Sequence, residues 1–282
     1  MARGLRLIVA SLACGTVGGS TAAGPVLVTG ATGRTGALLY GALKEKGVAV
    51  RALVRNATKA KEVLGCSKCD ASEGIFVGDV TKKDSLAPAM QGASALAIVT
   101  SAVPICSKPG DMTTCGYPKG AFPIDIDFHG GKAQIETFAE ANPGTQGPIV
   151  LCSSMGTTEP DNFLDKLGNG HILFYKLNLE AALMSSGLPF TVVKPCGLGD
   201  GPAGKQELVV GHDDEVQEKP PMVSRADVAR VMAGAVLQPS EAANLRFDLC
   251  ARAGTPTVDV SEVFKAARYP WQKRSLTDKF AV

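Results

Sequence analysis

The stretch Val26-Leu27-Val28-Thr29-Gly30-Ala31-Thr32-Gly33-Arg34-Thr35-Gly36 decides the fold of this chain. A short apolar run that predicts a buried strand leads into a glycine-rich turn, and a helical pattern begins near Arg34. Gly30 permits the tight turn, Gly33 lets the backbone approach a pyrophosphate, and Gly36 lets the helix pack closely on the strand. The helix start presents free N–H groups to an anion. We therefore predict a dinucleotide-binding turn; a purely structural glycine turn is the alternative.

Short apolar runs alternate with amphipathic stretches along the rest of the chain. They predict strands at 26–29, 48–54, 75–77, 95–99, 149–152, 190–193 and 245–249, and helices at about 34–46, 58–64, 83–90, 130–141, 171–186, 225–237 and 258–267. This alternation is typical of a parallel sheet covered by helices on both faces. We predict an α/β fold, with one doubly wound Rossmann-type sheet forming a single domain over residues 25–282. The long connections 101–128 and 196–222 should border the ligand crevice.

The composition excludes several classes of partner. Hydrophobic residues make up 45% of the 282 positions and charged residues 20%, as in an ordinary globular protein. The 29 Lys and Arg residues nearly balance the 27 Asp and Glu residues, so the net charge of +2 is too small to favour nucleic acid or an anionic membrane. Aromatic residues make up only 5% of the chain, which gives little support to a stacking platform for single-stranded nucleic acid.

Residues 1–24 differ from the rest of the chain in composition. They contain Arg3 and Arg6 but no acidic residue, and the first acid of the chain is Glu45. The apolar stretch 5–14 is too short to cross a bilayer, so we expect no membrane span. The segment is predicted to be a removable leader, either a secretory signal or the transit peptide of an organelle such as the plastid. A leader retained on a cytoplasmic protein is the alternative.

The eight cysteines lie mostly singly in or beside apolar segments, where free cysteine behaves as a small hydrophobic residue. Their spacing does not resemble a disulfide framework. The pair in Cys66-Ser67-Lys68-Cys69 has a spacing that could bind a metal or change redox state. A zinc site would need a second pair at similar spacing, so we expect no metal site. For Cys66 and Cys69 we expect a structural or incidental role, with a reversible disulfide as the alternative.

The glycine spacing G-x-x-G-x-x-G resembles that of extended and atypical short-chain dehydrogenases/reductases. Gly78-Asp79-Val80-Thr81, Thr100-Ser101-Ala102, Ser153-Ser154-Met155-Gly156 and residues 225–229 continue the resemblance. Residues 162–176 and 208–215 look specifically like the NmrA-like NAD(P)-binding proteins of plants and algae, and the match covers residues 25–270. The resemblance implies these cofactor-binding residues: Gly30, Thr32, Gly33, Arg34, Thr35, Gly36, Arg55, Asp79, Val80, Thr100, Ser101, Ser153 and Lys176.

The end of the second predicted strand favours NADP(H) over NAD(H). NAD sites place a carboxylate there, about 20 residues beyond the glycines, whereas NADP sites place a cation for the 2′-phosphate. The strand reads Val48-Ala49-Val50-Arg51-Ala52-Leu53-Val54-Arg55-Asn56 and contains no acid. We expect Arg55 to lie at the 2′-phosphate, with Arg34 on its other side. The alternative is that Arg55 is only a solvated charge at the strand end.

The candidate catalytic residues depart from the family pattern. The family uses a Tyr as proton donor, a Lys four residues later that lowers the pKa of the phenol, and a Ser that orients the carbonyl. By resemblance Lys176 is this lysine and Ser154 this serine, which leaves Ile172 at the tyrosine position. Tyr175 is adjacent to Lys176, but neighbouring helical residues point about 100° apart, so it cannot simply replace the missing tyrosine. The candidates for catalysis are Ser154, Lys176 and Tyr175.

Three functions remain open at this point. The first is an NADPH-dependent oxidoreductase acting on a small carbonyl, enone or quinone, because hydride transfer is the cofactor's own chemistry and an altered acid does not forbid it. The second is a non-catalytic NADP(H)-binding redox sensor or partner-docking protein, as the NmrA-like resemblance implies, for which a protein partner is expected. The third, an epimerase or isomerase that uses bound NAD transiently, fits poorly, since it would need the same Tyr/Lys pair and usually a larger C-terminal substrate domain.

Overall fold

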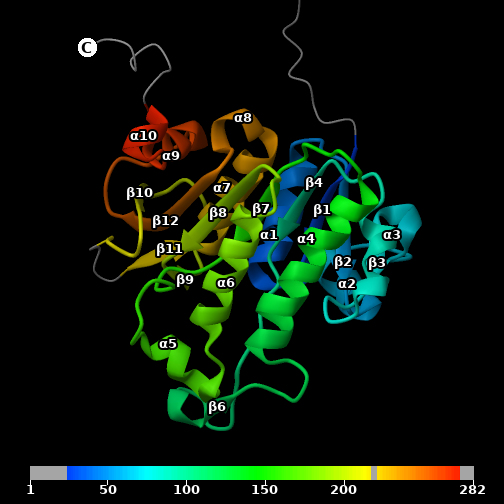
Figure 1. Cartoon of the computed structure of the whole chain (residues 1–282), viewed down its shortest axis with the longest axis horizontal. Coiled ribbons are helices and arrows are strands. Elements are labelled where there is room, and N and C mark those ends of the chain that lie inside the picture. Colours follow the sequence, from blue (N-terminus) through cyan, green and yellow to red (C-terminus); the bar gives the residue numbers. More distant parts are fainter. Residues whose placement is uncertain (1–23, 217–220, 274–282) are drawn as a thin grey trace, which may run out of the picture.

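The computed structural model describes residues 24–216 and 221–273, so the predicted leader lies outside them except for Gly24. The chain forms a single α/β domain around one large sheet (Figure 1). The sheet order is β3-β2-β1-β4-β7-β8-β12-β11-β9, with β10 paired to β12. The strands are β1 (Val26–Thr29), β2 (Val50–Val54), β3 (Ile75–Val77), β4 (Ala95–Ile98), β7 (Ile149–Cys152), β8 (Phe190–Pro195), β9 (Gly197–Gly199), β10 (Glu207–Gly211), β11 (Met222–Ser224) and β12 (Leu245–Arg252).

Helices cover both faces of this sheet, and a separate hydrophobic core lies between the sheet and the helices on each face. On one face α4 and α6 lie side by side, and α1 and α7 pack against each other on the opposite face (Figure 1). The helices are α1 (Arg34–Glu45), α2 (Ala57–Leu64), α3 (Ala87–Met90), α4 (Gly130–Ala141), α5 (Phe163–Lys166), α6 (Ile172–Met184), α7 (Arg225–Leu237), α8 (Pro239–Ala242), α9 (Val260–Ala266) and α10 (Pro270–Lys273). The predicted α/β class and doubly wound sheet are therefore confirmed.

All seven predicted strands are present and pair in parallel, from β3 to β12. Three further strands, β9 to β11, come from the connection 196–222, which was expected to be a loop. β10 and β11 pair antiparallel with β12. These strands are short, and each is stabilised by a partner distant in the sequence, so local periodicity did not reveal them.

The connection 101–128 also contains unpredicted structure. It forms a small hairpin of β5 (Ile105–Cys106) and β6 (Cys115–Gly116), followed by a π-helical segment, Ile124–His129, that runs directly into α4. Within residues 24–216 and 221–273, no helix is long and apolar enough to cross a membrane.

The expectation that the cysteines form no disulfide framework is wrong. Among the seven cysteines in the described residues, three disulfides join Cys66 to Cys69, Cys106 to Cys115, and Cys196 to Cys250, and Cys152 is free. Cys196 follows β8 and Cys250 lies in the neighbouring strand β12, although 54 positions separate them in the sequence. Such a pair is created by the strand order, which cysteine spacing does not reveal.

Candidate functional site

The glycine turn lies between the carboxyl end of β1 and the start of α1, as predicted. Gly30 has φ +67°, and a Cβ there would lie 2.7 Å from the carbonyl oxygen of Val99. A Cβ at Gly36 would overlap the carbonyl of Gly30. Gly33 is exposed at the N-cap of α1, and a Cβ there would meet only the Gly30 oxygen, at 3.1 Å. No side chain among the described residues caps the first N–H groups of α1, so the turn offers an open cradle for an anion.

The other residues of this loop have distinct environments. Thr32 is half-buried in the turn, and Thr35 is buried in the first turn of α1. Arg34 is exposed and forms an ion pair with Asp200, which also binds Arg225 Nη1 at 2.9 Å. Asp200 is not among the residues predicted from the sequence; it holds the segment after β9 against the start of α1.

Arg55 is exposed at the carboxyl end of β2. In the described part of the chain it forms no salt bridge, so its guanidinium is available to a phosphate. Asp79, after β3, accepts hydrogen bonds from Thr81 N (3.0 Å) and Thr81 Oγ1 (2.8 Å). Burial raises the pKa of Asp79, but these bonds and the charge of Arg55 outweigh it and leave the pKa below its ordinary value. Val80 is buried against the start of α4.

Asp127 organises the carboxyl end of β4, although it is not among the residues predicted from the sequence. It lies in the π-helical segment before α4 and is only 2% exposed. Asp127 Oδ1 accepts a hydrogen bond from Ser101 Oγ (2.9 Å) and lies 2.8 Å from Lys176 Nζ. Asp127 Oδ2 accepts the N–H of Ala102 (2.9 Å). One carboxylate therefore joins two predicted site residues from β4 and α6; the only sequence signal was an acid just before a predicted helix.

Lys176 is held in its charged form by this contact. The side chain lies on α6 and the residue is 9% exposed. Burial alone would lower its pKa, but the charge of Asp127 and its hydrogen bond outweigh burial and raise the pKa. Thr100 is held from α4, because its hydroxyl accepts a hydrogen bond from Gln134 Nε2 (3.1 Å).

Ser153, predicted to bind cofactor, has its hydroxyl directed to a buried ionic network. The hydroxyl donates a hydrogen bond to the Glu180 carboxylate, whose other oxygen is 2.8 Å from Arg246 Nε. Arg246 also binds Asp213 at 2.6 Å. Through Glu180 and Arg246, the Ser153 hydroxyl links the end of β7 to α6 and β12. Its hydrogen bond in the described part of the chain goes to this network and not to the glycine turn.

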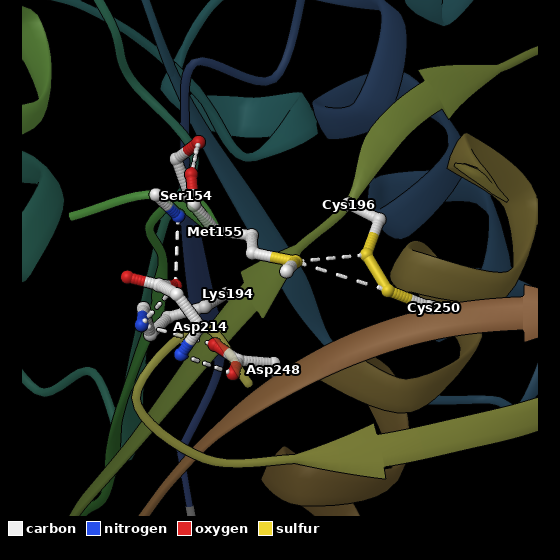
Figure 2. The surroundings of a disulfide bond; sticks show 8 residues. Ser154, Met155, Lys194, Cys196, Asp214, Asp248 and Cys250 are labelled. Carbon is white, nitrogen blue, oxygen red and sulfur yellow. Dashed lines mark hydrogen bonds and ion pairs between the residues drawn. A yellow bond between two sulfur atoms is a disulfide. The ribbon is translucent and has the colours of Figure 1, made fainter. Parts of the chain in front are cut away.

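The segment after β7, which carries Ser154, is pinned by Asp214 (Figure 2). Asp214 accepts the N–H groups of Gly156 and Thr158, both at 2.7 Å. Ser154 Oγ donates to the carbonyl oxygen of Met155 (2.8 Å), and Met155 Sδ lies 3.1 Å from Cys196 Sγ. The resemblance included Asp214 only as part of a matching stretch, and its role emerges from these contacts.

Asp214 is itself fixed by a buried cluster. Lys194 Nζ lies 2.7 Å from Asp214 Oδ1 and 2.9 Å from Asp248 Oδ1, and Asp214 N donates to Asp248 Oδ2 at 2.8 Å (Figure 2). Burial raises the pKa of Asp214, but hydrogen bonds from Lys194, Thr158 and Gly156 outweigh it and lower the pKa to about 2. Burial raises the pKa of Asp248. The position of Ser154 therefore depends on strands β8 and β12.

The tyrosine position of the family pattern is occupied by half-buried Ile172, the first residue of α6. Tyr175 is half-buried beside Phe128, with ring centroids 6.4 Å apart. Another phenol, Tyr117, was not predicted: it is buried, and its hydroxyl has no hydrogen-bond partner among the described residues. Burial, together with the charges of Asp127 and Asp165, raises the pKa of Tyr117 to about 12.

Comparison with known proteins agrees with this arrangement. A family model described as NAD(P)H-binding matches residues 30–239, from the glycine turn to the start of α8. This chain belongs to that NAD(P)H-binding family. Within it, the chain is an NmrA-like, atypical short-chain dehydrogenase/reductase, as its relatives indicate.

Three relatives illustrate the range of the family. An uncharacterized chloroplastic protein of Arabidopsis thaliana is 40% identical over 251 residues, covering 85% of this chain and 74% of the relative. Sanguinarine reductase of Eschscholzia californica is 35% identical over 274 residues, covering 87% and 97%. The photosystem II assembly factor Ycf39 of Trieres chinensis is 31% identical over 176 residues, covering 62% and 46%.

Solved structures share the fold. A short-chain dehydrogenase/reductase from Veillonella parvula, solved in complex with NADP, has a TM-score of 0.58 and 13% identity, covering 83% of this chain and 97% of that one. The residues of this chain fit a nicotinamide dinucleotide: the uncapped start of α1 lies behind exposed Gly33, and Arg55 is a cation without a salt bridge among the described residues.

Proposed function

We propose that this protein is an NADPH-dependent oxidoreductase that reduces a small carbonyl, enone or quinone. The buried arrangement of Lys176, Asp127 and Ser101 is the observation that carries the proposal. The glycine turn can anchor a cofactor without a buried charged lysine. A buried ammonium at the carboxyl ends of the strands instead suits a site where charge changes during a reaction. The relative named sanguinarine reductase, matched over nearly its whole length, also supports a reductase.

Each binding residue would have a defined task. The glycine turn and the first N–H groups of α1 would hold the pyrophosphate, and Arg55 would bind the 2′-phosphate that distinguishes NADPH from NADH. Lys176, oriented by Asp127, would bind the nicotinamide ribose. When bound, the cofactor supplies the hydride. Thr100 and Ser101, which follow β4, would line the part of the cofactor between the pyrophosphate and the nicotinamide ribose.

Substrate orientation and protonation fall to residues beyond β7 and on α6. Ser154 can turn its hydroxyl from the Met155 carbonyl to a substrate oxygen, since the backbone that carries it is held by Asp214. With Ile172 at the family tyrosine position, we propose that Tyr175, the Ser154 hydroxyl or water delivers the proton. The missing phenol predicts slow turnover rather than none.

A non-catalytic NADP(H)-binding sensor or docking protein is the second candidate function. Ile172 in place of the tyrosine supports it, and so does the relative whose name describes an assembly factor. We also propose that the protein is imported into plastids. The chloroplastic relative and the acid-free, arginine-containing residues 1–24 support this location.

Binding and turnover separate the two functions. NADPH and NADH titrations, followed by cofactor fluorescence, test the role of Arg55, and equal affinities would contradict it. Aldehydes, enones and quinones are then screened for NADPH oxidation with the wild type, Ser154→Ala, Lys176→Ala and the exposed-lysine control Lys132→Ala. The reductase predicts turnover that both site variants lose and the control keeps. Tight NADPH binding without turnover across the whole screen would establish the sensor instead.

A further inference from the structure

The hairpin in the connection 101–128 is closed by a disulfide. β5 and β6 contribute two residues each, with Cys106 opposite Cys115 and their sulfurs bonded. The turn between them holds a 3-10 segment, Met112–Thr114, whose start is capped by the Asp111 carboxylate through the N–H of Thr113 (3.1 Å). Hydrogen bonds also run from Ser107 N to Thr114 O (3.3 Å) and from Lys108 N to Thr114 Oγ1 (3.1 Å). Because a two-stranded hairpin is only marginally stable in water and each strand here has two residues, the Cys106–Cys115 bond adds the covalent link between the strands.

The hairpin packs on the segment that leads into α6. A Cβ at Gly168 would lie 2.7 Å from Gly116 Cα, and a Cβ at Gly170 would overlap the ring of Tyr117, directly after β6. Figure 1 shows β6 beside α5, at the end of α6 where Ile172 begins the helix. Disorder in the hairpin would therefore loosen the start of the helix that carries Lys176.

The two cysteines of this disulfide differ in exposure. Cys106 is exposed, whereas Cys115 is 7% exposed. The pair Cys196 and Cys250 is buried at both ends. Thiol–disulfide exchange requires that a thiolate reach one sulfur along the bond, so Cys106 is open to attack and the Cys196–Cys250 bond is shielded.

We propose that the Cys106–Cys115 disulfide is a thiol–disulfide exchange site for a dithiol oxidoreductase of the thioredoxin class. Its redox state sets the order of the hairpin and of residues 164–172. This proposal goes beyond the proposed reductase reaction and does not depend on it, since no substrate or nicotinamide cofactor takes part.

The exchange is balanced in two steps. A thiolate of the partner attacks Cys106 Sγ, the bond to Cys115 breaks, and the Cys115 thiolate takes a proton. The partner's second thiol, as its thiolate, then attacks the mixed disulfide and releases Cys106, which is protonated. Two electrons and two protons reach this chain and the partner becomes a disulfide; the oxidised partner reverses the reaction.

The Cys66–Cys69 disulfide provides a matched control. Its turn keeps other constraints when reduced, because the Glu73 carboxylate accepts the N–H groups of Lys68 (2.9 Å) and Cys69 (2.8 Å). Breaking this bond should leave the backbone around it ordered, and it lies far along the chain from residues 164–172.

The full chain is incubated with reduced thioredoxin, and free thiols are alkylated over time and located by mass spectrometry. We expect Cys106 and Cys115 to be labelled at least about tenfold faster than Cys196 and Cys250. Hydrogen exchange is then compared between the oxidised and reduced wild type. Faster exchange in peptides covering 105–118 and 164–172 is the expected result.

Variants assign any change to one disulfide. Cys106→Ser/Cys115→Ser should reproduce the faster exchange without reductant, and Cys66→Ser/Cys69→Ser should leave both peptides unchanged. If the first variant does not fold, the reduced wild type still provides the test. Finding Cys106 and Cys115 still disulfide-bonded after incubation with reduced thioredoxin, or labelled no faster than Cys196 and Cys250, would overturn the proposal, as would unchanged exchange at 164–172 once their bond is reduced.

Discussion

Replacing Asp127 by Asn isolates the charge that holds Lys176. Asn keeps the shape and can still accept the N–H of Ala102 and bond to Ser101, so the principal loss is the 2.8 Å ion pair. Removing one partner of a buried pair costs about 3–5 kcal/mol. In the variant Lys176 can lose its proton and become neutral. For an amine of pKa 10.5 this costs about 5 kcal/mol at pH 7, which is the upper limit of the loss in unfolding free energy. We expect the variant to lose about 3–5 kcal/mol of unfolding free energy at pH 7.

The pH dependence identifies the group responsible. In the wild type, burial lowers the pKa of Lys176 but Asp127 outweighs it, so the pKa is raised above 10.5 and the stabilisation persists below that pH. In the variant burial is opposed only by the smaller effects of Cys152 and Glu180, so we expect the folded-state pKa to fall below 10.5 and stability to rise with pH up to that value. The difference between the two proteins should therefore shrink from pH 7 to pH 10, by at most about 1.4 kcal/mol per pH unit.

Urea unfolding at each pH measures this difference, with Asp125→Asn from the same π-helical segment as the control. Asp125 is half-buried, and among the described residues its carboxylate has no hydrogen bond or salt bridge, so that variant should match the wild type. If Asp127→Asn lowered the unfolding free energy by less than about 1 kcal/mol, the reasoning would be refuted, because that loss is typical of a solvent-exposed salt bridge. A difference that stays constant or grows with pH would refute the assignment to Lys176.

Three further outcomes are expected. Arg55→Ala should weaken NADPH binding by about 10- to 100-fold, the worth of charge-assisted hydrogen bonds, and leave NADH binding and the exposed control Lys59→Ala unchanged in a fluorescence titration. Gly36→Ala, whose Cβ would overlap the turn backbone, should abolish binding and lower the melting temperature, whereas Gly41→Ala in the same helix meets nothing within 4 Å and should be neutral or stabilising. Asp214 has a pKa of about 2 against an ordinary 3.8, so its stabilisation is complete above about pH 4 and lost as pH falls toward 2; Asp214→Asn should flatten that part of an acid-denaturation curve.

Local pattern was sufficient for the frame of the molecule. Each of the seven parallel strands is a short apolar run, and the glycine turn requires only neighbouring residues to form, so both could be predicted from consecutive positions. The position of the exposed Arg55 could be predicted in the same way, because in this topology the end of the second strand lies where the cofactor's ribose is expected. The cofactor role of these residues stays a prediction for the binding experiments.

Non-local contacts decided the rest. Asp127 meets Lys176 across 49 positions because α4 and α6 lie side by side, and Asp214 reaches Gly156 because β10 folds back along β12. The disulfide between Cys196 and Cys250 likewise depends on the order of strands β8 and β12. Periodicity and spacing describe how each residue relates to its neighbours in the chain. The sequence by itself thus determined the seven parallel strands and the glycine turn, whereas the strands β9 to β11 and the partners of each buried charge and sulfur were decided by which elements the tertiary fold packs together.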